Sequence, residues 1–268
     1  MDYQDIIYTK VEGIATITLN RPDRMNAFSP EMSASIYRAV EDSDKDKEVR
    51  VLVITGTGRA FCAGADVKSM AERASQPSAE VSPGERGVNP EVGHVQLPVL
   101  MQRFRKPIIA SINGVAVGGG LDLALCCDIR IASDKARFAE VFIRRGLIPA
   151  MGGTYFLPRL VGVDRACQLI WTGDMVDAKE AERIGLVTKV VPHEELESAT
   201  RELAEKLAKG PPLAIQKAKE AIYKGLGMDL ESTLRYVGSI VRELNKTEDH
   251  KEGARAFVEK REPVFRGE

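Results

Sequence analysis

Residues 112–124 read INGVAVGGGLDLA, and this stretch decides how the surrounding chain folds. It continues the apolar run PIIASI of residues 107–112, which is typical of a buried parallel strand. We interpret residues 114–120 as a glycine-rich turn and residues 121–127 as a short apolar helix. A helix N-terminus presents free N–H groups with a partial positive charge, and glycines let a ligand approach the backbone closely. The stretch therefore predicts a ligand site at the start of a helix.

A second stretch of the same kind lies earlier, where residues 60–68 read AFCAGADVK. It follows the apolar strand pattern RVLVIT of residues 50–55 and also runs through small residues into an expected helix. Two backbone N–H groups that converge from such turns would form an oxyanion hole. Each stretch alone is equally compatible with a simple tight turn, so the sequence leaves both readings open.

The rest of the first 192 residues alternates strands with short helices. Further strands are predicted at residues 14–19, 129–132 and 186–191, from runs of Ile, Val, Leu and Thr. Helices are predicted after Ser29-Pro30 and after Asp177, where Glu180 stands as in a capping box and Gly185 ends the helix. Ser, Pro, Gly and Glu dominate residues 75–98, which predicts a long surface loop.

The character of the chain changes after His193. The segments that follow are charged, amphipathic and helical in period, at residues 194–209, 211–225, 229–245 and 248–260. The fold class is therefore α/β, with a layered core over residues 1–192 and a helical region over residues 193–268.

Composition excludes several classes of protein. The 268 residues carry 38 basic and 39 acidic side chains, a net charge of −1, which argues against a general nucleic-acid binder. No apolar run is long enough for a membrane helix, and the first residues do not form a signal peptide. None of the four cysteines stands in a C-x-x-C motif and the three histidines are far apart, so we expect reduced thiols, no metal site and a cytoplasmic location.

Common nucleotide and hydrolase motifs are missing or incomplete. Gly56-Thr57-Gly58 follows a strand, but Phe61 stands where a dinucleotide-binding motif has its third glycine and would block close helix–strand packing. The chain contains neither a G-x-x-x-x-G-K-[ST] loop nor a G-x-S-x-G nucleophile turn.

Motifs in a fixed order run along nearly the whole chain. They are Asn20-Arg21-Pro22, Asn26-Ala27, residues 61–68 and 113–122, Gly146-Leu147-Ile148-Pro149, Gly152-Gly153-Thr154, Leu157-Pro158-Arg159, Thr172-Gly173 and residues 256–260. In these motifs the chain resembles the crotonase (enoyl-CoA hydratase/isomerase) superfamily. The resemblance implies a spiral of ββα turns with a helical C-terminal region, assembled as a homotrimer or a dimer of trimers.

The resemblance also implies an acyl-CoA thioester as substrate. Its carbonyl oxygen would lie between the backbone N–H groups of Ala65 and Gly119, and CoA would enter as part of the substrate, with no metal or redox cofactor. The residues that would line the CoA and acyl path are Arg24, Ala63, Ala65, Asp66, Val67, Lys68, Gly118, Phe142, Phe257 and Lys260. Phe257 and Lys260 reach CoA from a neighbouring subunit in some members. Arg24 is equally well read as an exposed loop arginine, and Asp66 as a structural residue.

The acid–base positions depart from the family pattern. Hydratases carry two glutamates, which fall here at Asp122 and Phe142, while another branch uses the position of Ala150; neither Phe142 nor Ala150 can move a proton. Asp122 remains as the catalytic candidate. Its alternative role is that of an acid in the first turn of the helix, where the helix dipole favours it. Glu140 is a second candidate, because it precedes Phe142 by two residues and residues i and i+2 of an extended segment share a face. Its alternative role is that of an exposed or ion-paired acid. Tyr155, Cys62 and His94 are weaker candidates.

These residues predict an enzyme that passes through a thioester enolate, either an enoyl-CoA hydratase or a double-bond isomerase. The bulk of Phe142 disfavours standard hydration of a simple enoyl-CoA and suits isomerisation, or a bulky or cyclic acyl group. The alternatives are a CoA-thioester-binding protein with little catalysis, a thioester hydrolase and a C–C lyase.

Overall fold

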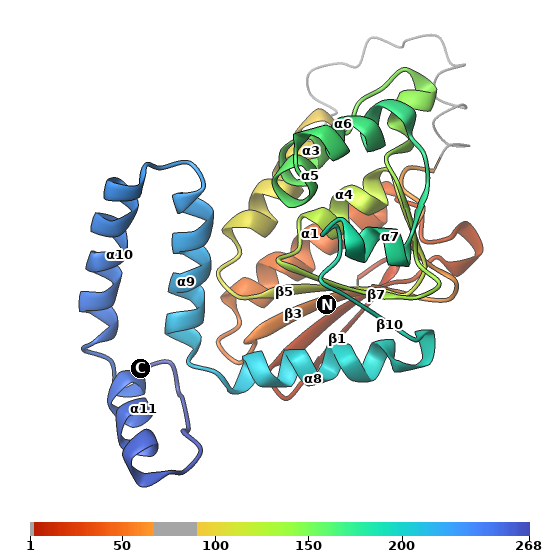
Figure 1. Ribbon diagram of the computed structural model, residues 1–268. Helices are drawn as coiled ribbons and strands as arrows, with labels where there is room; N and C mark the ends of the chain where they lie inside the picture. Colours follow the sequence, from red (N-terminus) through yellow and green to blue (C-terminus); the bar gives the residue numbers. More distant parts are fainter. Residues whose placement is uncertain (1–2, 67–89) are drawn as a thin grey trace, which may run out of the picture.

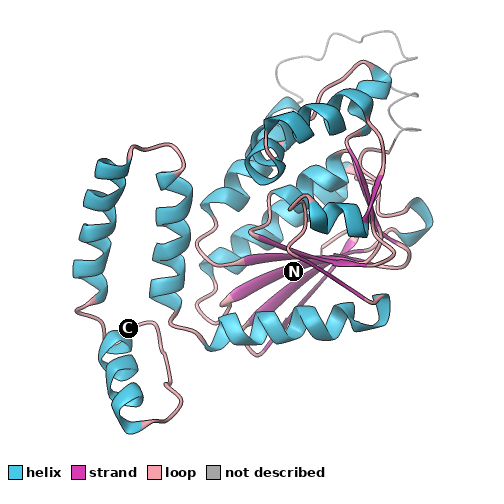
Figure 2. Ribbon diagram, in the orientation of Figure 1, coloured by secondary structure: helices cyan, strands magenta, loops and turns pink. Residues whose placement is uncertain are grey.

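A computed structural model describes residues 3–66 and 90–268, with side chains from residue 96 onward in the second range. Two β-sheets form its centre (Figures 1 and 2). The six-stranded sheet has the order β1 (Ile6–Val11), β2 (Ile14–Leu19), β3 (Val51–Gly56), β5 (Ile108–Ile112), β7 (Ile129–Ser133), β10 (Lys189–Val191). The four-stranded sheet has the order β4 (Ala60–Cys62), β6 (Val115–Val117), β8 (Arg137–Ala139), β9 (Val176–Asp177).

Successive strands alternate between the two sheets. β3, β5 and β7 are neighbours in the first sheet, and β4, β6 and β8, which follow them in sequence, are neighbours in the second. All of these neighbours pair in parallel. The chain therefore advances one strand in each sheet per turn, and the predicted spiral of ββα turns is confirmed.

The interpretation of residues 114–120 as a turn was wrong in part, because β6 lies within it. Val115, Ala116 and Val117 pair with β8, and Ala116 is fully buried. A strand of three residues has too little length to show a period of two in sequence. Its backbone hydrogen bonds come from strands that are distant in the chain.

Helices cover both faces of the six-stranded sheet (Figure 1). Alternate residues of β3 show the division, since Leu52 and Ile54 belong to the main core while Val51 and Val53 pack in the cluster that includes α8 (Leu196–Lys209). The main core also takes side chains from α1 (Pro30–Lys45), α3 (Pro90–Arg103) and α4 (Gly119–Leu125).

The predicted helix starts at Ser29 and Asp177 are confirmed. Ser29 Oγ accepts the Met32 N–H at 2.9 Å, and Asp177 Oδ1 accepts the Glu180 N–H at 2.8 Å at the start of α7 (Ala178–Arg183). The reciprocal half of the capping box was wrong. The Glu180 carboxylate instead binds the Arg183 guanidinium at 2.6 and 2.7 Å, because an arginine one turn away supplies charged donors.

The predicted loop at residues 75–98 was wrong from residue 90 onward, where α3 begins; the earlier residues of that prediction lie outside the described chain. Leu97, Met101 and Phe104 recur at helical spacing and are buried in the core. This packing outweighs the helix-breaking effect of Pro98, which on sequence alone argues against a helix here.

The four predicted C-terminal helices are confirmed as α8, α9 (Pro212–Gly225), α10 (Leu230–Leu244) and α11 (Glu248–Glu259). α9 to α11 stand beside the core in Figure 1. A buried polar cluster ties α9 to the sheet, because Lys219 Nζ lies 2.7 Å from Asp128 Oδ2 and the Tyr223 hydroxyl donates to Asp128 Oδ1 at 2.7 Å. The remaining elements are η1 (Pro22–Arg24), η2 (Val141–Arg145), α5 (Gly153–Val161), α6 (Val163–Thr172) and η3 (His193–Glu195).

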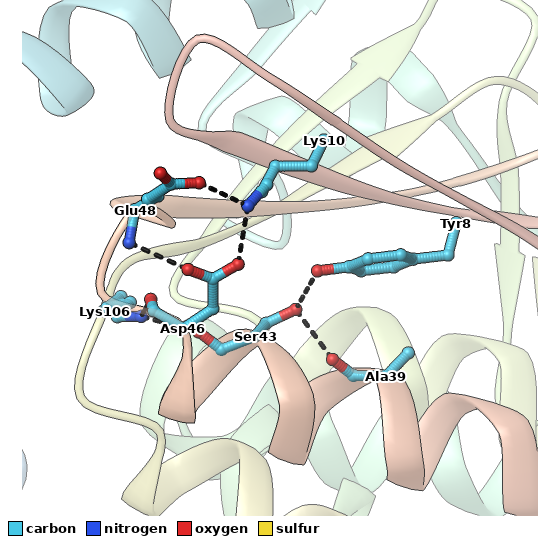
Figure 3. A network of polar contacts seen from close by, with 7 residues as sticks. All are labelled: Tyr8, Lys10, Ala39, Ser43, Asp46, Glu48 and Lys106. Atoms are coloured by element: carbon cyan, nitrogen blue, oxygen red, sulfur yellow. Dashed lines mark hydrogen bonds and ion pairs between the residues drawn. The ribbon is translucent and has the colours of Figure 1, made fainter. Parts of the chain in front are cut away.

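A polar network at the C-terminal end of α1 joins this helix to the sheet (Figure 3). Lys106 Nζ, which is buried, donates to the carbonyl oxygens of Ser43 and Asp46, both at 2.6 Å. Lys10 Nζ, which is partly exposed, lies 2.8 Å from Asp46 Oδ2 and 2.6 Å from Glu48 Oε2. Each lysine contacts two oxygen atoms, but Lys106 is buried and Lys10 is partly exposed.

We expect Lys106→Met to lower the free energy of unfolding by about 1–3 kcal/mol, because it leaves the shielded Ser43 carbonyl oxygen without its donor and the Asp46 carbonyl with only the Val49 N–H, at 3.2 Å. Lys10→Met is the matched control, and should cost less than about 1 kcal/mol since its ion pairs are exposed to solvent. Urea unfolding of both variants measures the difference. Equal losses would contradict the view that burial decides the contribution of these lysines.

Candidate active site

The two glycine-containing turns lie side by side. Gly64 has a left-handed φ of 82°, and a Cβ placed on it would lie 2.6 Å from the carbonyl oxygen of Val117 and 3.1 Å from the amide nitrogen of Gly119. A Cβ on Gly120 would collide with the carbonyl oxygen of Cys62. Only glycine allows this approach, so the turn after β4 meets the turn after β6 at the start of α4.

The local backbone decides which groups the N–H of Ala65 and the N–H of Gly119 can reach. Ala65 forms a parallel bridge with Phe28, in which Phe28 N–H donates to the Gly64 carbonyl at 2.8 Å. In such a bridge Phe28 bonds to the residues on either side of Ala65, so the N–H of Ala65 itself points away from it. Gly119 is the first residue of α4, and the first N–H groups of a helix have no partner within it.

Two buried carboxylates lie beside these turns. Asp122 stands in the first turn of α4 and Glu140 directly precedes η2, and neither side chain is exposed. A Cβ placed on Gly153 would collide with Asp122 Oδ1 and lie 3.0 Å from Glu140 Oε1, so the two side chains meet at the start of α5. Helix spacing puts Asp122 near Gly119, but only the tertiary fold brings Glu140 there.

Hydrogen bonding distinguishes the two carboxylates. Asp122 Oδ2 accepts the N–H of Met151 at 3.1 Å. Within the described residues, Asp122 Oδ1 and both carboxylate oxygens of Glu140 have no hydrogen-bond partner. Buried polar atoms are rarely left in this state, and where they are, a ligand or a catalytic role is a frequent reason.

Burial raises the pKa of both groups. For Asp122 it raises the pKa to about 7, against the backbone hydrogen bonds that favour the charged form. For Glu140, burial and the neighbouring Asp122 charge together raise the pKa well above its usual range. Burial and the closeness of the two acids therefore favour the presence of one proton on the pair near neutral pH.

Apolar side chains line the same place. The Phe142 ring lies 3.8 Å from where a Cβ on Gly118 would stand, and the Phe28 ring lies 3.3 Å from the equivalent point on Gly119. Met151 contacts both parts of the site, with Sδ 3.5 Å from that point on Gly119 and its N–H bonded to Asp122. Aromatic rings therefore lie next to both Gly118 and Gly119.

Other predicted residues are distributed as follows. Ala63, Asp66 and Gly118 lie in the two converging turns, whereas Val67 and Lys68 lie outside the described residues. Arg24 is exposed on η1. Phe257 is 86% exposed on α11 and Lys260 ends that helix, so within one chain neither reaches the turns at α4 (Figure 1).

Two of the weaker acid–base candidates, Tyr155 and Cys62, have described side chains. Tyr155 is partly exposed and stacks on the Arg159 guanidinium, 3.7 Å from its ring centre. Cys62 is fully buried under Gly120, and burial raises the pKa of its thiol to about 12, which keeps it protonated. Ala150 is exposed. His94 belongs to α3, and its side chain is not among those that the structure describes.

Sequence reasoning gave no role to Phe28, Met151 or Gly153. The family motifs around them, Asn26-Ala27 and Gly152-Gly153-Thr154, were the available signal. No group of three side chains that could hold a metal ion occurs among residues 3–66 and 96–268. In the same part of the chain, no helix is both long and apolar enough to cross a bilayer.

Comparison with known proteins identifies the family of the chain. The family model described as enoyl-CoA hydratase/isomerase matches residues 9–268. A crotonyl-CoA hydratase of Syntrophomonas wolfei is 38% identical over 99% of both chains, and an (E)-benzylidenesuccinyl-CoA hydratase of Thauera aromatica is 40% identical over 95% of this chain and 96% of its own. A crystal structure of an enoyl-CoA hydratase from Bacillus anthracis superimposes with a TM-score of 0.90, at 37% identity over 99% of this chain and 100% of its own.

The chain belongs to the enoyl-CoA hydratase/isomerase family. It is an enzyme of that family, and its class of substrate is the acyl-CoA thioester.

Proposed function

We propose that this enzyme is an enoyl-CoA hydratase that uses Asp122 and Glu140 as its two carboxylates and the N–H groups of Ala65 and Gly119 as its oxyanion hole. The observation that carries the proposal is the meeting of two fully buried carboxylates at Gly153, next to the converging turns. Glu140 thereby supplies the second acid that Phe142 cannot supply. The names of the relatives, several of them hydratases, support the same reaction.

The two carboxylates take different roles in this mechanism. Asp122, with the lower pKa and the Met151 hydrogen bond, is the base that accepts a proton as a water oxygen attacks the β-carbon of the enoyl group. Negative charge moves to the thioester oxygen, where the two N–H groups stabilise it. Glu140, which keeps its proton, donates it to the α-carbon. A proton then passes from Asp122 to Glu140 and restores the pair.

Double-bond isomerisation is the second candidate. The Phe142 ring next to Gly118 takes space that a water molecule could otherwise use, and one carboxylate is enough to remove and return a proton. The same ring would pack well against a cyclic or aromatic acyl group, as in the substrate named for the Thauera relative.

Incubation with a trans-2-enoyl-CoA, a 3-enoyl-CoA and a cyclic dienoyl-CoA separates these reactions. Hydration adds the mass of one water and removes the conjugated absorbance, whereas isomerisation of the 3-enoyl substrate creates that absorbance at constant mass. We expect hydration of at least one 2-enoyl thioester. Three results would overturn the proposal. Binding without turnover would indicate a binding protein, release of free CoA would indicate a thioester hydrolase, and cleavage of the acyl chain would indicate a C–C lyase.

We extend the proposal to self-association through the C-terminal helices, as a homotrimer or a dimer of trimers. Large apolar side chains stand exposed there, among them Leu230 at 75%, Leu234 at 60% and Phe257 at 86%. Such an assembly would let Phe257 and Lys260 reach a neighbour's CoA. Analytical sedimentation measures its size, and a monomer at micromolar concentration would contradict it.

The remaining assignments stay predictions. We propose that Arg24 and Lys68 contact CoA phosphates, and that Ala63, Asp66, Val67 and Gly118 line the path of the acyl-CoA. The proposed chemistry needs no metal or redox cofactor, since backbone donors and carboxylates carry each step. The cytoplasmic location and the lack of nucleic-acid or membrane partners are likewise expectations from the sequence.

A further inference from the structure

Arg21 joins three segments that are distant from one another in the chain. Its Nη1 donates to the carbonyl oxygen of Ala27 at 2.6 Å. Its Nη2 lies 3.6 Å from Asp66 Oδ2, and its Nε lies 3.5 Å from Asp5 Oδ2. The side chains of Arg21 and Asp66 are only 21% and 15% exposed, so this ion pair is partly shielded from water.

The loop that carries Arg21 is itself rigidly held. Asn26, which is fully buried, adopts a left-handed φ of 55° and accepts the Arg21 N–H through Oδ1 at 2.8 Å. Its Nδ2 donates to the carbonyl oxygens of Thr57 and Ala60, at 3.0 and 2.8 Å. Thr57 lies on the β3–β4 connection and Ala60 begins β4, so Arg21 starts from a fixed point next to the strand that leads to Ala65.

The backbone at Ala65 is anchored on both sides. On the N-terminal side, the Gly64 carbonyl accepts Phe28 N–H at 2.8 Å, and Ala63 N–H donates to the Met25 carbonyl at 3.0 Å. On the C-terminal side, Asp66 is the next residue, and its carboxylate is the group that Arg21 faces. The ion pair therefore connects the residue after Ala65 to the loop that carries Arg21.

We propose that Arg21 is a positioning residue that acts through Asp66 to orient the N–H of Ala65. This inference rests on the proposed function, in which Ala65 N–H stabilises the thioester oxyanion. Negative charge develops on that oxygen in the transition state, so a misdirected donor costs more there than in the bound substrate. Loss of the ion pair should therefore lower kcat and leave KM nearly unchanged, since small displacements of catalytic groups can cost up to ~10²-fold in rate.

The test uses Arg21→Met, Asp66→Asn and the double variant in the full-length chain, with initial rates on a 2-enoyl-CoA that the wild type turns over. We expect each single change to lower kcat by about 10-fold to 10²-fold. The double variant should be no slower than the slower single variant, because residues that act as one unit are not additive. Arg21→Lys should recover part of the loss, since the charge next to Asp66 is kept.

Asp5→Asn is the control, because it removes the other ion pair of Arg21, of nearly equal length, while the amide oxygen can still accept the Ser29 hydroxyl that Asp5 Oδ2 holds at the start of α1. It should leave kcat unchanged. Three results would overturn the inference. The first is an unchanged kcat in Arg21→Met, and the second is a loss of kcat in the double variant that equals the two single losses combined. The third is a loss of kcat in Asp5→Asn that matches the loss in Arg21→Met and comes with a lower melting temperature. A wild type that turns over no enoyl-CoA would instead refute the proposed function, so the two failures are distinguishable.

Discussion

Replacement of Asp122 by asparagine is expected to lower kcat by about 10²-fold to 10⁴-fold, the usual contribution of a positioned general base. The amide has nearly the shape of the carboxylate, and its oxygen can still accept the N–H of Met151, so the loop after η2 keeps its anchor. What is lost is the ability to take a proton from water. Initial rates on a 2-enoyl-CoA, with circular dichroism to verify the fold, measure the effect.

The pH profile gives this prediction a second readout. Burial raises the pKa of Asp122 to about 7, and a raised carboxyl pKa means that the basic form is present above that pH and disappears below it. The wild-type rate should therefore fall as the pH drops through about 7, and Asp122→Asn should lose this dependence. Asp174→Asn, at an exposed ion pair with Arg144, is the control and should change neither rate nor profile. Full activity in Asp122→Asn would remove Asp122 from the mechanism.

Gly119→Pro should lower kcat by about 10²-fold to 10³-fold, which is the usual effect of removing one oxyanion-hole donor. Gly119 is the first residue of α4, the helix position where proline is best tolerated because its N–H has no partner within the helix. The substitution therefore replaces the N–H by the Cδ of the proline ring, while the helix can still form. Steady-state rates and calorimetric binding of a saturated acyl-CoA separate catalysis from binding.

Gly119→Ala is the matched control for crowding. A Cβ at this position would lie 3.3 Å from the Phe28 ring and 3.5 Å from Met151 Sδ in either variant, but alanine keeps the N–H. We expect alanine to cost far less rate than proline. If both variants lose activity equally, contact with Phe28 explains the loss and Gly119 is not a hydrogen-bond donor to the substrate.

Much of the site could be predicted where its residues are close in sequence. Gly119 and Asp122 are separated by three residues, so a helix alone puts them on one side. Glu140 was reached only by assuming an extended segment, and its complete burial depends on Gly153 and Asp122, which belong to other segments. The ion pair between Arg21 and Asp66 left no local pattern at all, because the two residues meet only when the loop before α1 lies against the turn after β4.

Local sequence was sufficient for the buried strands β3, β5 and β7, for the caps at Ser29 and Asp177, and for the amphipathic C-terminal helices. These features depend on periodicity and on hydrogen bonds within a few residues. Tertiary structure alone decided the three-residue strand β6, the helix at α3 and the meeting of the two carboxylates. Each of these is stabilised by packing or backbone pairing between segments far apart in the chain, and such long-range contacts leave no periodic signal in either segment.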